Sequence, residues 1–190
     1  MENSARSERS RNAAIQAALT IIARDGPGRL TLDAIARESG ISKGGVMHQF
    51  RTKGAVLKAL LEHQIEYFEK FTRDYLAENG AGDPEAQLSA QIATLRQVAI
   101  DPHSVAFAIV AALAEEPELL MITRGVEVES IDRIKAEAVD PDLAMLRWSA
   151  ARGLALSALF GLYALPDEDR ERLFDRLLDG RQWAAFEQDR

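Results

Sequence analysis

Residues 31–50 contain two short segments with a helical apolar pattern, separated by a single glycine. Thr31 precedes the first segment and Ser42 precedes the second, and both residue types are favoured N-caps of helices. Gly40 stands between the segments and can adopt the left-handed backbone conformation that a tight turn between helices needs. The pattern predicts two short helices that cross at this turn. Such a pair leaves its second helix free to lie in the major groove of DNA.

The rest of the chain also follows a helical period. Apolar residues recur at helical spacing in residues 9–25 and 53–78. Proline is tolerated in a first helical turn and disfavoured in a helix interior, and it stands near the start of every later predicted helix. These later helices are predicted at 84–99, 102–115, 117–139, 142–165 and 167–179. No segment shows the sustained alternation of a β-strand, so the predicted fold class is all-α.

Charge is distributed unevenly along the chain, whose net charge is −7. Residues 1–54 hold nine Lys and Arg against five Asp and Glu, a net charge of +4, whereas residues 55–190 carry −11. A basic segment on an acidic body is expected when only one end of a protein meets phosphate. The alternative is chance clustering beside a solvated acidic surface.

Several classes of protein are disfavoured by what the sequence lacks. There is no cysteine, which excludes disulfides and thiolate metal sites and fits a reducing cytosol. The N-terminus is polar, and the longest apolar stretch, residues 153–165, is shorter than the ~20 residues that span a bilayer. No G-x-S-x-G, phosphate-loop or H-E-x-x-H motif occurs. We therefore expect a cytoplasmic protein that does not interact with membranes, is not an enzyme and uses no metal or cofactor.

The stretch AALTIIARDGPGRLTLDAIARESGISKGGVMHQFRTKGAVLKALL resembles the N-terminal domain of the TetR family of regulators. The resemblance covers about residues 9–62. It rests on four short patterns in this stretch. They are the paired alanines at its start, the G-x-x-x-x-T sequence that ends at Thr31, the turn from Ala36 to Gly44, and the phenylalanine and lysine at Phe50 and Lys53. It implies a homodimer that binds a palindromic DNA operator, usually as a repressor, and that leaves the DNA when a small-molecule effector binds the body.

The resemblance also implies which residues contact DNA. On the second helix these are Ser42, Lys43, Gly44, Gly45 and His48, while Thr31 and Lys53 correspond to phosphate contacts at helix starts. Met47 is a further candidate contact, because it is expected on the exposed face of the second helix. Two positions depart from the usual family pattern. Met47 stands where tyrosine is common, and Gly54 stands where glutamate is common, which removes a carboxylate from a first helical turn. The exposed arginines Arg6, Arg9 and Arg11 are expected in an N-terminal arm, either solvated or touching DNA.

In the body, four small residues recur every fourth position of the predicted helix 142–165 and form a ridge along it. Such a ridge lets another helix approach closely, and packing offsets the cost of its two interior glycines. The next predicted helix carries an apolar stripe. We expect these two helices to form the dimer interface, through Ser149, Gly153, Ser157, Gly161, Leu173, Phe174, Leu177 and Leu178. The alternative is that the ridge packs inside one subunit.

An effector pocket is expected among the helices of the body, lined mostly by apolar groups with a few polar ones. The candidate lining residues are His63, Tyr67, Phe71, Ile92, Leu95, Arg96, His103, Phe107, Met121 and Trp148. The expected organisation is thus an N-terminal three-helix helix-turn-helix domain at residues 1–54, joined by a long helix to a ligand-binding and dimerisation domain at residues 55–190. The remaining alternative is a helical effector-binding or protein-interaction module that has lost specific DNA binding.

Overall fold

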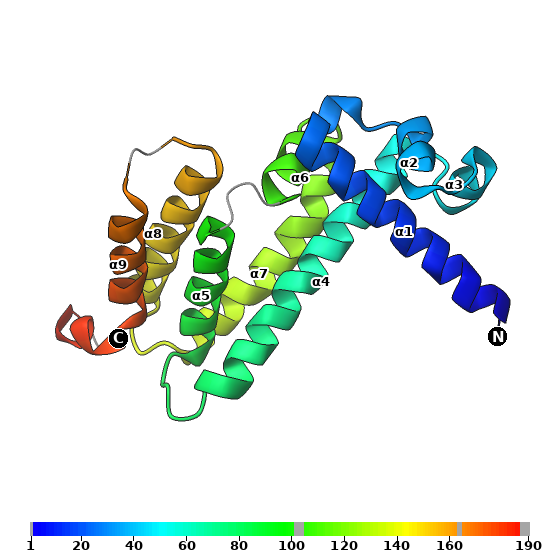
Figure 1. Ribbon diagram of the computed structural model, residues 1–190. Coiled ribbons are helices and arrows are strands. Elements are labelled where there is room, and N and C mark those ends of the chain that lie inside the picture. The colour runs from blue at the N-terminus through cyan, green and yellow to red at the C-terminus, as the bar shows by residue number, and fades with distance from the viewer. Residues whose placement is uncertain (1, 101–104, 163–164, 187–190) are drawn as a thin grey trace. The chain divides into compact units, whose positions relative to one another are not determined.

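The computed structural model describes residues 2–100, 105–162 and 165–186, without the side chains of residues 2–4, 105, 107 and 108. Every element in these ranges is helical, which confirms the all-α prediction (Figure 1). The α-helices are α1 (Glu2–Asp25), α2 (Leu32–Ser39), α3 (Lys43–Gln49), α4 (Lys53–Asn79), α5 (Ala86–Ile100), α6 (Val105–Leu113), α7 (Leu120–Glu137), α8 (Pro141–Leu159) and α9 (Asp167–Leu178). Short 3-10 helices are η1 (Pro27–Arg29), η2 (Pro117–Leu119), η3 (Gly180–Gln182) and η4 (Ala184–Phe186).

The chain forms two compact units, which are described separately. The N-terminal unit contains residues 1–65 and 103–121, and the C-terminal unit contains residues 66–102 and 122–190. The division falls inside the long helix α4, after residue 65, whereas the predicted boundary follows residue 54. The difference arises because α6 contacts α1 and η1, so that a later stretch of the chain returns to the N-terminal unit.

The core of the N-terminal unit is built from α1, α2, α3 and the first half of α4. Its largest fully buried side chains are Ile21, Leu30, Ile35, Val46, Phe50, Val56 and Leu60. Helix α1 begins at Glu2, so the predicted N-terminal arm is wrong: this segment is part of the helix. The amide of Gln49, at the end of α3, donates to the hydroxyl of Ser7 at 3.0 Å and ties this first part of α1 to α3.

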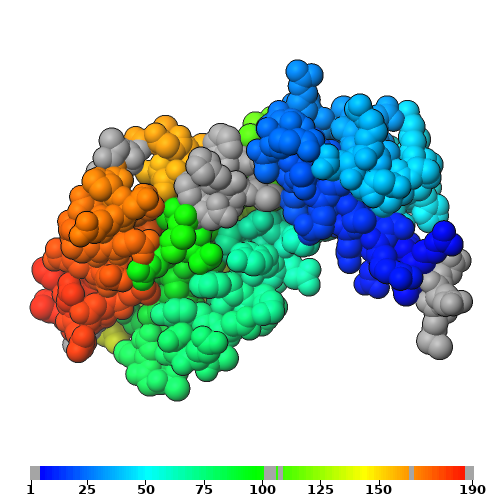
Figure 2. Space-filling view, in the orientation of Figure 1, coloured from blue at the N-terminus to red at the C-terminus, as the bar shows by residue number. Residues whose placement is uncertain are grey.

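The core of the C-terminal unit lies where α5 meets α8 and α9. Leu88 and Ile92 of α5, Ala151 and Ala155 of α8, and Phe174 of α9 are buried against one another. Figure 2 shows α9 and the C-terminal segment, in orange and red, beside α5 in green. A hydrogen bond of 3.0 Å between the hydroxyls of Thr72 and Thr94 links the second half of α4 to α5.

Helix α8 ends at Leu159, six residues before its predicted end at residue 165. Gly161 adopts a left-handed conformation with φ of 61°. The N–H of Leu162 donates to the carbonyl of Ser157 at 2.9 Å, and the N–H of Gly161 donates to that of Ala158 at 3.2 Å. This pair of bonds is a Schellman motif, which terminates a helix. Gly161 is therefore a helix stop, and its prediction as the fourth member of a ridge along α8 is wrong.

Among the described helices, none combines the length and the apolar character that a crossing of the bilayer requires.

Candidate nucleic-acid interface

The turn between α2 and α3 is built by local hydrogen bonds around one glycine. The Thr31 hydroxyl accepts from the N–H of Ala34 at 3.0 Å and caps the start of α2. Gly40 ends α2 with φ of 68°, a conformation that costs glycine little. The Ser42 hydroxyl then accepts from the N–H of Gly45 at 3.1 Å and starts α3. The structure thus contains the predicted helix-turn-helix, with both N-caps in place.

Burial fixes which side of α3 faces outward. Val46 of α3 and Ile35 of α2 are fully buried and hold the two helices together. On the other side of α3, the predicted contact residues Ser42, Lys43, Gly44, Met47 and His48 are exposed, and Gly45 is partly so. The face that the sequence assigned to DNA is therefore open to solvent, as an interface with nucleic acid requires.

The two glycines of α3 have different surroundings. A Cβ added to Gly44 would meet nothing within 4 Å, so this backbone is open to close approach from outside. A Cβ added to Gly45 would lie 2.7 Å from Cγ2 of Ile41 and 3.2 Å from the Ser42 hydroxyl. Gly45 therefore keeps the turn compact and leaves the Ser42 cap undisturbed, a structural role that its spacing in the sequence did not reveal.

Both lysines that are predicted to contact DNA are paired with carboxylates. Nζ of Lys43 lies 2.9 Å from Oδ1 of Asp33, in the first turn of α2. Nζ of Lys53, at the start of α4, lies 2.5 Å from Oε2 of Glu115, which follows α6 in the chain. The Thr52 hydroxyl caps α4 by accepting from the N–H of Ala55 at 3.0 Å. The pair with Glu115 was not foreseen, because nothing in the sequence relates two residues so far apart.

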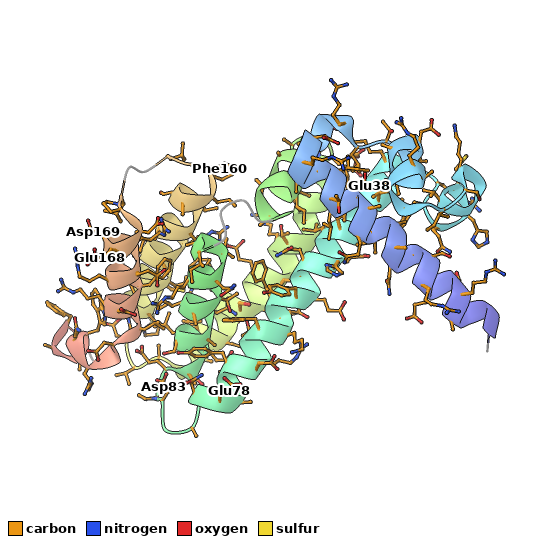
Figure 3. All side chains as sticks on the ribbon, viewed as in Figure 1. Glu38, Glu78, Asp83, Phe160, Glu168 and Asp169 are labelled. Carbon is orange, nitrogen blue, oxygen red and sulfur yellow. The ribbon has the colours of Figure 1, made fainter. Side chains whose placement is uncertain are left out.

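A further ion pair holds α1 to α2. The Arg24 guanidinium donates to the carboxylate of Asp25 at 2.9 Å and to that of Glu38 at 3.0 Å. Glu38, labelled in Figure 3, reaches α1 from α2. The hydrogen bond from Arg24 lowers the pKa of Asp25, and the bonds to both carboxylates raise the pKa of Arg24. This ion pair joins α1 to α2, and α2 packs against the recognition helix α3.

The predicted dimer residues lie on α8, on α9 and just beyond α8. Ser149 and Gly153 are exposed and Ser157 is partly exposed, so the ridge is not covered within its own subunit. Phe174 is completely buried in the core of the C-terminal unit, so its predicted place between subunits is wrong. Periodicity showed an apolar stripe on α9 but not which of its members point inward. Leu173 is exposed, whereas Leu177 is buried and Leu178 is partly buried.

A groove of about 430 Å³ runs between α8 and α9. It is lined by Ala150, Gly153, Leu154, Ser157, Leu173, Arg176, Leu177 and Trp183. Exposed apolar side chains elsewhere on α8 and just after it include Leu146, Leu156 and Phe160, the last of which is labelled in Figure 3. Trp183, which the sequence did not single out, is held by a hydrogen bond of 2.9 Å from its indole N–H to the carbonyl of Arg176.

The ten predicted effector-pocket residues have varied surroundings. Ile92 is buried in the core, and Leu95 and Trp148 pack against it. Arg96 is engaged by two carboxylates of α9, Glu171 at 2.7 Å and Asp175 at 2.9 Å. His63, Tyr67 and Met121 are exposed and Phe71 is partly buried, whereas His103 and the Phe107 side chain lie outside the described residues. None of the eight whose side chains the structure describes lines the groove between α8 and α9, and the pocket stays a prediction.

No group of three His, Cys, Asp or Glu side chains within the described ranges is arranged to hold a metal ion. The predicted absence of a metal rests on the sequence alone.

Two family models match the chain. The model described as bacterial regulatory proteins, tetR family, matches residues 14–60, which include α2 and α3. The model described as tetracyclin repressor-like, C-terminal domain, matches residues 69–180, more than half of the chain. Among curated proteins, the HTH-type transcriptional regulator BetI of Yersinia pestis (strain Pestoides F) is 29% identical over 80 residues. That match covers 42% of this chain and only 40% of the relative.

Solved structures share the fold over most of the chain. A transcriptional regulator from Rhodococcus sp. Rha1 has a TM-score of 0.67 and 22% identity, and the match covers 92% of this chain and 96% of that one. The multidrug binding protein EbrR, complexed with ethidium, has a TM-score of 0.61 and 21% identity over 88% and 97% of the two chains. A candidate regulator from Saccharomonospora viridis, in complex with choline, has a TM-score of 0.66 and 16% identity over 93% and 97%.

The helix-turn-helix geometry and the two family models point to the same conclusion, as does the likeness of fold along both units. The protein is a transcription factor with a DNA-binding N-terminal region and not an enzyme, because the chain belongs to the TetR family of bacterial transcriptional regulators.

Proposed function

We propose that the protein is a homodimeric repressor that binds a palindromic operator and is released from it by a small molecule. The observation that carries the proposal is the exposed face of α3, which the capped turn at Gly40 holds clear of the protein core. A two-fold dimer presents two such helices to two half-sites of one palindrome. Since its target is chromosomal DNA, the protein would act in the cytoplasm.

Electrostatics support the same assignment. The +4 charge of residues 1–54, which include the helix-turn-helix, contrasts with −11 on residues 55–190, as expected when only one end of the chain meets phosphate. Arg6 and Arg9 are exposed on the first part of α1, which the bond from Gln49 to Ser7 ties to α3. These arginines add positive charge on an element linked to the recognition helix. Binding should therefore weaken as salt rises, because phosphate contacts release counterions.

The proposal is tested by replacing Lys43 with alanine. We expect operator affinity to fall about tenfold, because a charge-assisted hydrogen bond to phosphate is lost and Asp33 is left without its partner. The measurement is fluorescence anisotropy with duplex fragments from beside the protein's own gene, at low and at near-physiological salt. Lys135→Ala removes the same charge from an exposed site on α7 and should bind like the wild type.

If the wild-type protein bound neither these fragments nor random duplex at low salt, the repressor proposal would fail. The alternative of an interaction module without specific DNA binding would then take its place. A Lys43→Ala variant that bound as tightly as the wild type would remove α3 from the proposed interface.

A substitution at Gly44 should change operator affinity without reducing the stability of the protein. Replacing it with alanine should leave stability unchanged or raise it by up to about 1 kcal/mol, since the new Cβ meets nothing and alanine favours a helix. The same methyl group would stand between α3 and an approaching phosphate or base, so operator affinity should fall. Thermal unfolding and anisotropy on one preparation check both effects. Equal loss of stability and affinity would contradict this assignment.

The proposed dimer interface is the groove between α8 and α9 with the apolar residues around it. Ser149 and Gly153 are small and exposed, so a helix of a second subunit can approach α8 closely. Leu146 is 68% exposed, and an apolar side chain of this kind gains from being covered. The C-terminal segment contributes Trp183 to the same groove.

The proposed effector is a small molecule that binds the body. It releases DNA only if it binds the DNA-incompetent state more tightly than the DNA-bound one. Structural neighbours bind choline and ethidium, both organic cations. Because residues 55–190 carry −11, organic cations are the first class to screen against the protein–operator complex.

A further inference from the structure

Two adjacent carboxylates cover the start of α4 within the N-terminal unit. Oε2 of Glu115 lies 2.5 Å from Nζ of Lys53, and Lys53 keeps only 32% of its side chain exposed. Oε1 of Glu116 lies 3.2 Å from the position that a Cβ on Gly54 would take. The two acids thus approach the first two residues of α4 from the segment between α6 and η2.

Backbone hydrogen bonds hold this acidic segment in place. The N–H groups of Glu115 and Glu116 donate to the carbonyls of Ala112 and Leu113, at 3.0 and 3.2 Å, and continue the end of α6 as turns. The N–H of Leu119 donates to the carbonyl of Glu116 at 3.0 Å. Because α6 packs on α1 and η1, the position of the two carboxylates depends on how α6 is seated.

The absence of a side chain at Gly54 makes room for this approach. Gly54 lies in the first turn of α4, where the helix dipole and the unpaired N–H groups favour a negative charge. Glycine has no side chain and so provides no carboxylate at residue 54. Glu116, more than sixty residues later in the chain, brings a carboxylate to the same place. The departure at Gly54 is therefore matched by an acid from elsewhere in the chain.

We propose that Glu115 and Glu116 form an acidic clamp that competes with DNA phosphate for Lys53 and the start of α4. The inference rests on the proposed function, in which Lys53 meets phosphate. A carboxylate and a phosphate are both anions that accept from the same ammonium group, so one excludes the other. The clamp lowers affinity for DNA in the unliganded protein. It also makes that affinity sensitive to any displacement of the segment after α6.

The test compares four full-length variants on one DNA probe, a duplex that the wild-type protein selects from a random pool. Glu115→Gln keeps the shape of the side chain and removes its charge. We expect DNA affinity to rise about two- to fivefold, the range that an exposed ion pair spans. Glu118→Gln removes a charge from another exposed side chain, on η2 and three residues away, and should change affinity by less than about 1.5-fold.

A double-mutant cycle separates the clamp from a general effect of net charge. In the Lys53→Ala background, Glu115→Gln should raise affinity no more than Glu118→Gln does, because there is no longer a lysine to release. A gain that persists without Lys53, or a Glu115→Gln effect no larger than that of Glu118→Gln, would overturn the clamp while leaving the repressor intact. A wild-type protein that selects and binds no duplex would instead refute the proposed function. Thermal unfolding of each variant shows that the proteins compared are equally folded.

Discussion

Replacing Gly153 with arginine is expected to separate the protein into monomers and to lower its affinity for operator DNA by about a hundredfold or more. The loss arises because a dimer binds its second half-site as an intramolecular event, and the gain from linking two sites is typically 10²–10⁴. Gly153 is exposed on α8 and lines the groove between α8 and α9. A long, charged side chain there would be buried and unpaired in a close helix–helix contact.

The same substitution should be harmless inside one subunit. A Cβ at Gly153 meets nothing within 4 Å, and arginine is a better helix former than glycine by about 0.8 kcal/mol. The variant therefore tests the interface and not the fold. Light scattering coupled to size-exclusion chromatography reports the oligomeric state, and anisotropy with the operator reports DNA affinity.

Gly125 provides a matched control, since it is an exposed glycine inside α7 whose added Cβ would likewise meet nothing. Gly125→Arg should remain a dimer and bind DNA like the wild type. If Gly153→Arg also stayed dimeric at the same concentrations, the groove between α8 and α9 would not be the interface. If both variants dissociated, the effect would belong to added arginine in general.

Replacing Arg147 with methionine is expected to reduce the free energy of unfolding of the protein by about 3 kcal/mol or more. Arg147 is only 2% exposed and has several partners in the C-terminal unit. It forms an ion pair with Glu85, which precedes α5, and its Nη2 donates to the carbonyl of Leu177 at 2.9 Å. Its guanidinium also lies 5.7 Å from the centroid of the Trp183 ring.

The cost follows from what the variant leaves behind. Glu85 keeps a charge with 15% of its side chain exposed, and the carbonyl of Leu177, in the last turn of α9, loses a donor. Removing one partner of a buried pair is more costly than removing both, because the remaining charge stays desolvated. We therefore expect Arg147→Met combined with Glu85→Gln to recover part of the lost stability.

Urea unfolding followed by circular dichroism measures the change, and a loss of this size should lower the Tm by roughly 6–12 °C for a chain of this length. Arg133→Met removes the same charge from an exposed site on α7 and should change stability by less than about 0.5 kcal/mol. An Arg147→Met variant as stable as Arg133→Met would show that the buried network contributes little. Tryptophan fluorescence, which comes from Trp148 and Trp183, reports whether the surroundings of these two side chains change at the same time.

The helix-turn-helix was predictable because its determinants are local. Thr31 and Ser42 cap helices through N–H groups three residues away, and Gly40 makes the turn by its own backbone conformation. The all-α class followed from periodicity and from proline, which also act over a few residues. These interactions need no knowledge of which distant segments meet.

The remaining features depend on contacts between distant segments, and here the sequence left alternatives or led to errors. Periodicity placed Phe174 and Leu173 on one apolar stripe, but only packing against α5 decided that Phe174 lies in the core. Gly161 read as a ridge residue because a glycine in sequence does not show its φ.

Arg147 resembled any other arginine until Glu85 and the end of α9 surrounded it. The approach of Glu115 to Lys53 required α6 to return to the N-terminal unit. Residues near in sequence determine where helices begin and end, because their hydrogen bonds form within one or two turns. Burial and ion pairing between helices are decided only when the chain folds, because they depend on which surfaces come together.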